Sequence, residues 1–334
     1  MVLSLSTAWS ALLDRRNFLR GAAACGTALV VPVGRADSYP TRTVKFMSPF
    51  APGGGTDIIA RLLAQQLSRT LGQSVIVENK AGAEGAIGTQ FVARSAPDGY
   101  TLLLGNFGIF SVLPHVAKTP YDPLKDFVAV SQTTNSATVL VTSPKLNVRS
   151  VSELIEMAKR DPGRLNCGAS SSSPMAVMEL FKQMTGTNMM TVPYKGSGPA
   201  LQALMAGEID VMFGGALATI PMIKQGMVKA LATAGAKRTP LLPEVPTVAE
   251  AGVPGFAAES WNGVFAPAGT PAAIIRILSN EIQKALNAPE LRTAIGNEGA
   301  LVVGNTPEQF DAFVRNEHKR WGVVIEAAHL KEKR

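Results

Sequence analysis

Hydrophobic positions along this chain alternate between short apolar runs and longer stretches with one apolar face. Short apolar runs are typical of buried strands, whereas apolar residues three and four positions apart form one face of a helix. Between 57 and 71 the spacing is helical, and Gly72 follows as the residue that ends the helix. The apolar runs predict strands at 43–50, 75–78, 101–104, 139–141, 165–168, 190–194, 209–213, 228–233 and 263–266. The helical spacing predicts further helices at 85–94, 150–160, 175–184, 199–205 and 270–287, and a last one from Thr306.

This alternation predicts an α/β fold. Strands separated by helices of about 10 to 15 residues indicate βαβ units and parallel sheets. The chain contains no internal repeat and no long linker, so any domain boundary falls in a short crossover. A length of 334 residues is enough for about two domains.

The first 36 residues have the pattern of an export signal. Arg15 and Arg16 begin a twin-arginine motif, RRNFL, which is followed by a short apolar stretch at 21–33 and by a small-x-small sequence ending at Ala36. The apolar stretch is too short to span a bilayer. We therefore expect export to the periplasm by the twin-arginine route, with cleavage near Ala36. The alternatives are an ordinary buried N-terminal helix, or a lipoprotein modified at Cys25, which lies before the apolar stretch has finished.

Composition excludes several classes of protein. Hydrophobic residues make up 46% of the chain and charged residues 17%, which rules out a disordered or collagen-like chain. Two cysteines exclude a disulfide scaffold, and removal of the signal would leave only Cys167, so no internal disulfide could form. No stretch concentrates the positive charge, and we therefore expect no nucleic-acid partner.

The candidate chemistry lies in turns between strands and helices. The sequence FAPGGGTD at 50–57 follows the first strand, and its glycines let a ligand approach the backbone closely. The unpaired N–H groups and the positive dipole end of the next helix favour a small anion there. Asp57 has two interpretations that can coexist, a cap on the first helical turn and an acceptor for a water or a ligand donor.

Three more turns occupy equivalent places. NKAGAEGAIG at 79–88 follows the second strand, and it is neither a dinucleotide-binding motif nor a P-loop. Two glycine turns at the carboxyl ends of adjacent strands strengthen the case for a ligand-binding site, because ligands of open α/β sheets bind there. The serines at 170–173 are ordinary caps or hydrogen-bond donors to a carboxylate. In the turn at 194–198, Lys195 either pairs with an anion or is simply solvated.

Signatures of enzymes and metal sites are weak. His115, His318 and His329 are widely spaced, and the chain contains no HExxH, CxxC or GxSxG motif. The serine run has no base near it in sequence, so nothing supports an activated serine. We expect no metal and no cofactor.

Several of these segments together resemble the substrate-binding proteins of tripartite tricarboxylate transporters, the Bug family of periplasmic receptors. The resemblance covers the chain from about Tyr39 to the C-terminus. The segments that carry it are PFAPGGGTD at 49–57, ENKAGAEGAIG at 78–88, PDGYTL at 97–102, YDPLKDF at 121–127, PYKG at 193–196, GEIDV at 207–211, LPEVPTVAEAG at 242–252 and WNGVFAPAGTP at 261–271.

The resemblance implies a two-lobed type II periplasmic binding protein, each lobe a mostly parallel sheet flanked by helices. Lobe one would comprise 37–140 and the return segment 263–334, and lobe two would comprise 141–262, after a signal at 1–36. A small carboxylate would bind between the lobes of a monomer, which would deliver it to the permease subunits of a tripartite tricarboxylate transporter. The alternatives are a receptor for a membrane sensor kinase, or an enzyme on the same fold that uses Asp57 as a general base.

The resemblance also implies which residues contact the ligand. The first loop of lobe one would contribute Phe50, Gly54, Gly55, Thr56 and Asp57, the second Gly82, Ala83 and Gly85, and lobe two Ser170, Ser171, Ser172, Tyr194, Lys195 and Gly196. One turn departs from the family. Members usually have a Gly-Asn-Gly-Ser turn followed by a histidine, whereas 168–175 reads GASSSSPM and contains no histidine. The sequence does not name the carboxylate.

Overall fold

The computed structural model describes residues 39–136 and 138–331, and from Tyr39 onward the chain forms one compact unit. The export signal predicted at 1–36 lies outside the described residues. Within them, no helix is both long enough and apolar enough to cross a membrane.

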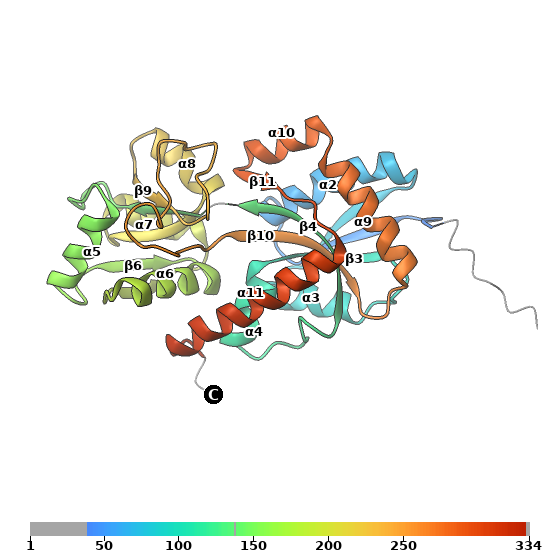
Figure 1. Ribbon diagram of the computed structural model, residues 1–334, viewed down its shortest axis with the longest axis horizontal. Coiled ribbons are helices and arrows are strands. Elements are labelled where there is room, and N and C mark those ends of the chain that lie inside the picture. Colours follow the sequence, from blue (N-terminus) through green and yellow to red (C-terminus); the bar gives the residue numbers. More distant parts are fainter. Residues whose placement is uncertain (1–38, 137, 332–334) are drawn as a thin grey trace, which may run out of the picture. The chain divides into compact units, whose positions relative to one another are not determined.

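Two mixed sheets organise the described residues (Figure 1). The first has the strand order β11-β4-β10-β3-β1-β2 and the second the order β7-β6-β8-β5-β9. The strands of the first sheet are β1 (Val44–Ser48), β2 (Val75–Asn79), β3 (Thr101–Asn106), β4 (Phe127–Ser136), β10 (Ser260–Pro267) and β11 (Ala300–Val302). Those of the second are β5 (Thr138–Thr142), β6 (Asn166–Ala169), β7 (Met190–Pro193), β8 (Val211–Gly215) and β9 (Lys229–Thr233).

Helices connect the strands and cover both faces of each sheet. They are α2 (Gly55–Leu71), α3 (Ala86–Ala93), α4 (Leu113–Val116), α5 (Val151–Arg160), α6 (Ser172–Thr185), α7 (Ser197–Ala206), α8 (Ala216–Lys224), α9 (Ala272–Leu286), α10 (Pro289–Asn297) and α11 (Pro307–Ala327). A 3₁₀ turn at Ala83–Gly85 precedes α3, and a π-helical turn at Gly108–Val112 precedes α4.

Each sheet contains three neighbouring parallel strands. In the first sheet β1 pairs in parallel with β2 and β3, and in the second β6 pairs in parallel with β7 and β8. The remaining pairings are antiparallel, so the expectation of mostly parallel sheets was too simple. The reason is the path of the chain. It leaves the first sheet through β4 and returns through β10, which therefore run side by side in opposite directions.

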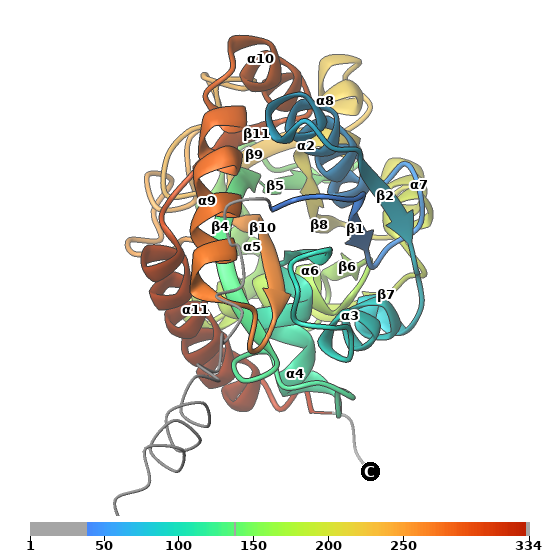
Figure 2. The same ribbon diagram turned by 90° about the vertical axis from the view of Figure 1, so that its right-hand side faces the viewer.

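Alternating side chains place a hydrophobic core on each face of the first sheet. Val44, Phe46, Leu102 and Leu104 point to the face covered by α2, α9 and α10, and they are almost fully buried there. The opposite face packs against α3, α11 and the π-helical turn, and its cluster continues through Phe181 of α6 to Phe213 of the second sheet. Both ribbon views place α10 next to α2 (Figure 2).

Several elements were not predicted from the hydrophobic pattern. The longest is β4, where Ser131, Gln132 and Thr134 are buried although their side chains are polar. Ser131 donates its hydroxyl to the Asn305 carbonyl at 2.8 Å, and the Gln132 N–H donates to the Asn305 side chain at 2.8 Å. Because these bonds satisfy the polar groups inside the fold, β4 needs no continuous apolar run. The elements α4, α8, α10 and β11 were missed as well.

Candidate ligand-binding site

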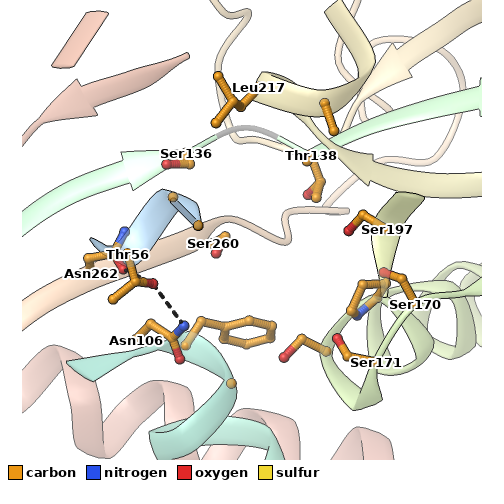
Figure 3. Close-up of a pocket in the computed structure, with 18 of the residues that line it drawn as sticks. Thr56, Asn106, Ser136, Thr138, Ser170, Ser171, Ser197, Leu217, Ser260 and Asn262 are labelled. Carbon is orange, nitrogen blue, oxygen red and sulfur yellow. Dashed lines mark hydrogen bonds between the residues drawn. The ribbon is translucent and has the colours of Figure 1, made fainter. Parts of the chain in front are cut away.

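A cavity of about 720 Å³ lies where the parallel strands of both sheets end. It is lined by residues that follow β1 and β3 in the first sheet, and β6, β7 and β8 in the second. Figure 3 shows Thr56, Asn106 and Asn262 on one side of it and Ser170, Ser171 and Ser197 on the other. This is the position at which open α/β sheets bind their ligands, the carboxyl ends of parallel strands.

Four helices begin at the wall of this cavity. The helices are α2, α6, α7 and α8, and residues of the first turn or the cap of each line it. Gly54, Gly196 and Gly215 are the N-cap residues of α2, α7 and α8, and none of them offers a side-chain cap. The first N–H groups of a helix have no partner within it, and the dipole makes this end positive. The cavity therefore presents uncapped amide donors from three helices.

Two helices with no residue in the cavity wall are capped in the usual way. Ser150 accepts the Glu153 N–H at the start of α5. Thr306 and Gln309 form a reciprocal capping box at the start of α11. Outside the wall, α3 and α9 also begin without a side-chain cap, so what marks the site is the convergence of three uncapped helix starts on one cavity.

A row of hydrogen bonds between polar side chains joins α2 to the strands β3, β10 and β4 of the first sheet. The Asn106 amide donates to the Thr56 hydroxyl at 3.4 Å, and that hydroxyl donates to Asn262 Oδ1 at 3.1 Å. The Asn262 amide in turn donates to the Thr134 hydroxyl at 3.1 Å. This row fixes the rotamer of Thr56 at the cavity wall and orients the first turn of α2 against β10.

The Glu84 side chain links the loop after β2 in the first sheet to the start of α6, the helix that follows β6 in the second sheet. Gly82, Ala83, Glu84 and Gly85 all have positive φ, which is unusual for the two non-glycine residues. The Ser172 hydroxyl donates to Glu84 Oε2, and the Ser172 N–H lies 3.4 Å from both carboxylate oxygens. The carboxylate therefore caps α6, which Ser171 does not cap with its own side chain.

Asp57 is buried below the first loop and does not line the cavity. Its side chain is 2% exposed and accepts the Gly53 N–H at 2.9 Å, the Asn79 amide at 2.7 Å and Arg61 Nε at 2.9 Å. Burial by itself would raise the pKa of Asp57, but the hydrogen bonds from Arg61, Gly53 and Asn79 outweigh it and hold the pKa below its usual value. Asp57 is thus a clamp on the glycine loop, and its geometry does not suit a general base.

The predicted contact residues divide into two groups. Those that line the cavity are Phe50, Gly54, Gly55, Thr56, Ser170, Ser171 and Gly196. Those that do not are Asp57, Gly82, Ala83, Gly85, Ser172, Tyr194 and Lys195. Two of the second group act on the wall indirectly. Ser172 holds Glu84, which lines the cavity, and Gly85 leaves room for Phe50, whose Cζ would lie 3.1 Å from an added Cβ.

The cavity also contains residues that sequence reasoning missed. Asn106, Phe107 and Gly108 lie at the end of β3, and Gly215 lies at the end of β8, so the rule used for the first two turns applied to them as well. Ser136, Thr138, Ser260 and Asn262 lie where the chain passes between the sheets, Glu298 follows α10, and Ala300 is the first residue of β11. The resemblance implied lobe boundaries near 140 and 262, but β4 itself was not predicted, and nothing in the pattern singled out these residues as lining a site.

The site can bind an anion without a basic side chain. Among the described residues that line the cavity, the ionisable ones are Glu84 and Glu298, and none is Lys, Arg or His. Hydroxyls, amides and helix N–H groups supply the donors. No cluster of three His, Cys, Asp or Glu residues suited to a metal ion occurs in the described part of the chain.

Comparisons with known proteins agree with this geometry. The sequence profile of the family described as "Tripartite tricarboxylate transporter family receptor" matches residues 59–330. The protein BugT of Bordetella pertussis is 40% identical over 312 residues, which cover 91% of this chain and 94% of BugT.

Two solved structures are also similar. One is an R. palustris protein with adipate, at 37% identity and a TM-score of 0.79, covering 87% of this chain and 98% of that one. The other is MatC from Rhodopseudomonas palustris with bound malate, at 35% identity and a TM-score of 0.75, covering 86% of this chain and 100% of that one.

Proposed function

This chain belongs to the tripartite tricarboxylate transporter receptor family, and from that premise we propose that it is a periplasmic receptor that captures a small carboxylate. The family predicted from the sequence motifs is thereby confirmed, and so is the fold of two sheets flanked by helices. Receptors of this family bind solutes, and relatives have been solved with adipate and with malate.

The single observation that best supports a carboxylate ligand is the convergence of uncapped helix starts on one cavity. The N-termini of α2, α7 and α8 present N–H groups without side-chain caps, and the dipoles of these helices add positive potential. These donors suit a carboxylate because its two oxygens accept several hydrogen bonds at once. No lining cation is needed for that recognition.

Capture would follow closure of two lobes around the ligand. We assign lobe one to 37–136 and 260–334 and lobe two to 138–259, a few residues from the predicted boundaries at 140 and 262, because β5 belongs to the second sheet and β10 to the first. A ligand held by α2 from one lobe and by α7 and α8 from the other stabilises the closed state, because it makes both sets of contacts only there. The Glu84 to Ser172 hydrogen bond crosses the same boundary and favours the closed state as well. The closed monomer would then deliver the ligand, unchanged, to the permease subunits.

Thermal unfolding against a panel of small carboxylates tests this function. The protein is unfolded and refolded first to remove any ligand that copurifies. An acid at 100 times its dissociation constant adds about 2.7 kcal/mol of apparent stability, which raises the midpoint by a few degrees. If no acid in the panel raises the midpoint of the refolded protein, the carboxylate assignment is wrong.

The export route is part of the proposal. Arg15 and Arg16 would direct the folded protein to the twin-arginine pathway, which suits a chain whose predicted mature form retains only Cys167. Changing both arginines to lysine is expected to leave the precursor in the cytoplasm, with little product in the periplasmic fraction. Cell fractionation and immunoblotting measure the two pools. Periplasmic accumulation equal to that of the unmodified chain would show that another route exports it.

A further inference from the structure

Glu298 occupies the cavity wall at the end of α10. It is the C-cap residue of that helix, and it precedes Gly299, whose φ is +76°. A Cβ built on Gly299 would lie 2.9 Å from the Ala216 Cβ and 3.7 Å from the Leu217 N–H nitrogen. The turn after α10 is therefore packed against the start of α8, which holds Glu298 at the edge of the first sheet facing the cavity.

The carboxylate of Glu298 has no partner within the described residues. Its Oε2 atom is shielded from solvent and makes no hydrogen bond, and the side chain takes part in no ion pair. Glu84, the other carboxylate in the wall, is paired with Ser172. Although the start of α8 lies next to Gly299, none of its N–H groups donates to Glu298.

Two effects make this an unfavourable place for an unpaired negative charge. Removing one carboxylate oxygen from water weakens hydration of the anion, and this cost is recovered only through a donor or a cation. The C-terminal end of α10 adds the negative end of a helix dipole, which favours cations nearby. Among the described residues of the wall, there is no Lys, Arg or His that could compensate either effect.

Building on the proposed function, we infer that Glu298 accepts a hydrogen bond from a donor on the ligand through its other carboxylate oxygen, Oε1, since Oε2 is shielded from the cavity as it is from solvent. The ligand is then a monocarboxylate that also carries a donor group, and an ammonium satisfies the site best. Its carboxylate occupies the uncapped helix starts, and its ammonium lies against Glu298. A second carboxylate at this end would be repelled by Glu298, so the receptor discriminates against unbranched dicarboxylates.

Matched acids of two lengths test this inference in binding titrations. The shorter series is 4-aminobutyrate, pentanoate and succinate, and the longer is 6-aminohexanoate, heptanoate and adipate. Within a series the carboxylate and the chain length stay nearly constant, while the far end is an ammonium, a methyl or a carboxylate. In at least one series the ammonium acid should bind about tenfold or more tightly than both partners, the scale of one buried charge-assisted hydrogen bond.

Glu298→Gln should bring that ratio to within about threefold, because the amide keeps the shape of the side chain and removes its charge. Glu290→Gln, an exposed carboxylate on the same helix, should leave the ratio unchanged and controls for net charge. Glu84→Gln should weaken all three acids by a similar factor, since it affects the contact between the sheets.

Equal affinities within both series, tighter binding of a dicarboxylate, or a ratio that survives Glu298→Gln would overturn the inference. So would failure of all six acids to bind. The proposed function is judged separately, because it survives any of these results if another carboxylate stabilises the refolded protein in the thermal panel.

Discussion

Replacing Gly55 with glutamate is expected to weaken carboxylate binding by about a hundredfold or more while leaving the protein folded. Gly55 is the first residue of α2, its φ is not positive, and an added Cβ would meet nothing within 4 Å. The new carboxylate would extend into the cavity and occupy the helix start that we assign to the ligand. It would also repel an incoming anion, and repulsion between like charges in contact costs several kcal/mol.

Stability separates this effect from misfolding. An acidic residue in the first turn interacts favourably with the helix dipole, so the melting temperature of Gly55→Glu should equal or exceed that of the parent chain. Ala272→Glu is the matched control, because Ala272 is exposed, is the first residue of α9 and does not line the cavity. Unchanged affinity in Gly55→Glu, or an equal loss in Ala272→Glu, would show that the start of α2 does not hold the carboxylate.

Asp57→Ala is expected to lower the free energy of unfolding by about 2–3 kcal/mol. The substitution leaves the Gly53 N–H and the Asn79 amide without their acceptor, and it removes the buried partner of Arg61. Arg61 is half exposed and regains water, so we place the loss below the usual cost of breaking a fully buried ion pair. Affinity should fall too, because the clamp sets the position of the glycine loop. Urea denaturation and ligand titration measure the two losses.

The pH dependence of stability gives an independent check on Asp57. Its pKa is lower in the folded state than in the unfolded chain, where an aspartate has a pKa of about 3.9. The stabilisation is therefore complete above that value and is lost as the pH falls through the folded pKa. Asp57→Asn should flatten this acid limb of the stability curve. An acid limb of the same slope in both proteins would mean that Asp57 is not stabilised as an anion.

The sequence predicted the parts of the site that follow local rules. A glycine turn between an apolar strand and an amphipathic helix fixes both the local conformation and the exposure of the helix start, which is why Gly54, Gly55 and Thr56 were found. Asp57 and Lys195 show the limit of this reasoning. Whether a polar residue in such a turn points into the cavity or away from it depends on partners such as Asn79, which the pattern does not identify.

Long-range pairing accounts for most of what was missed. Asn262 lies 206 positions from Thr56, and no spacing in the sequence reveals that they share a hydrogen bond. Ser136 and Thr138 line the cavity because the chain passes from the first sheet to the second after β4. Since several buried residues of β4 are polar, the hydrophobic pattern did not predict it as a strand. The position of Glu298 in the cavity wall depends on α10 and β11, two short elements at one edge of the first sheet that the pattern did not predict.

The central claim is that helix N–H groups hold the ligand through its negative charge. Calorimetric titration of the refolded protein with the tightest acid of the thermal panel, and then with the primary amide of that acid, tests it directly. The amide keeps the size and one carbonyl oxygen but has no charge. The account predicts that the amide binds about a hundredfold or more weakly, whereas equal affinity for acid and amide would contradict it.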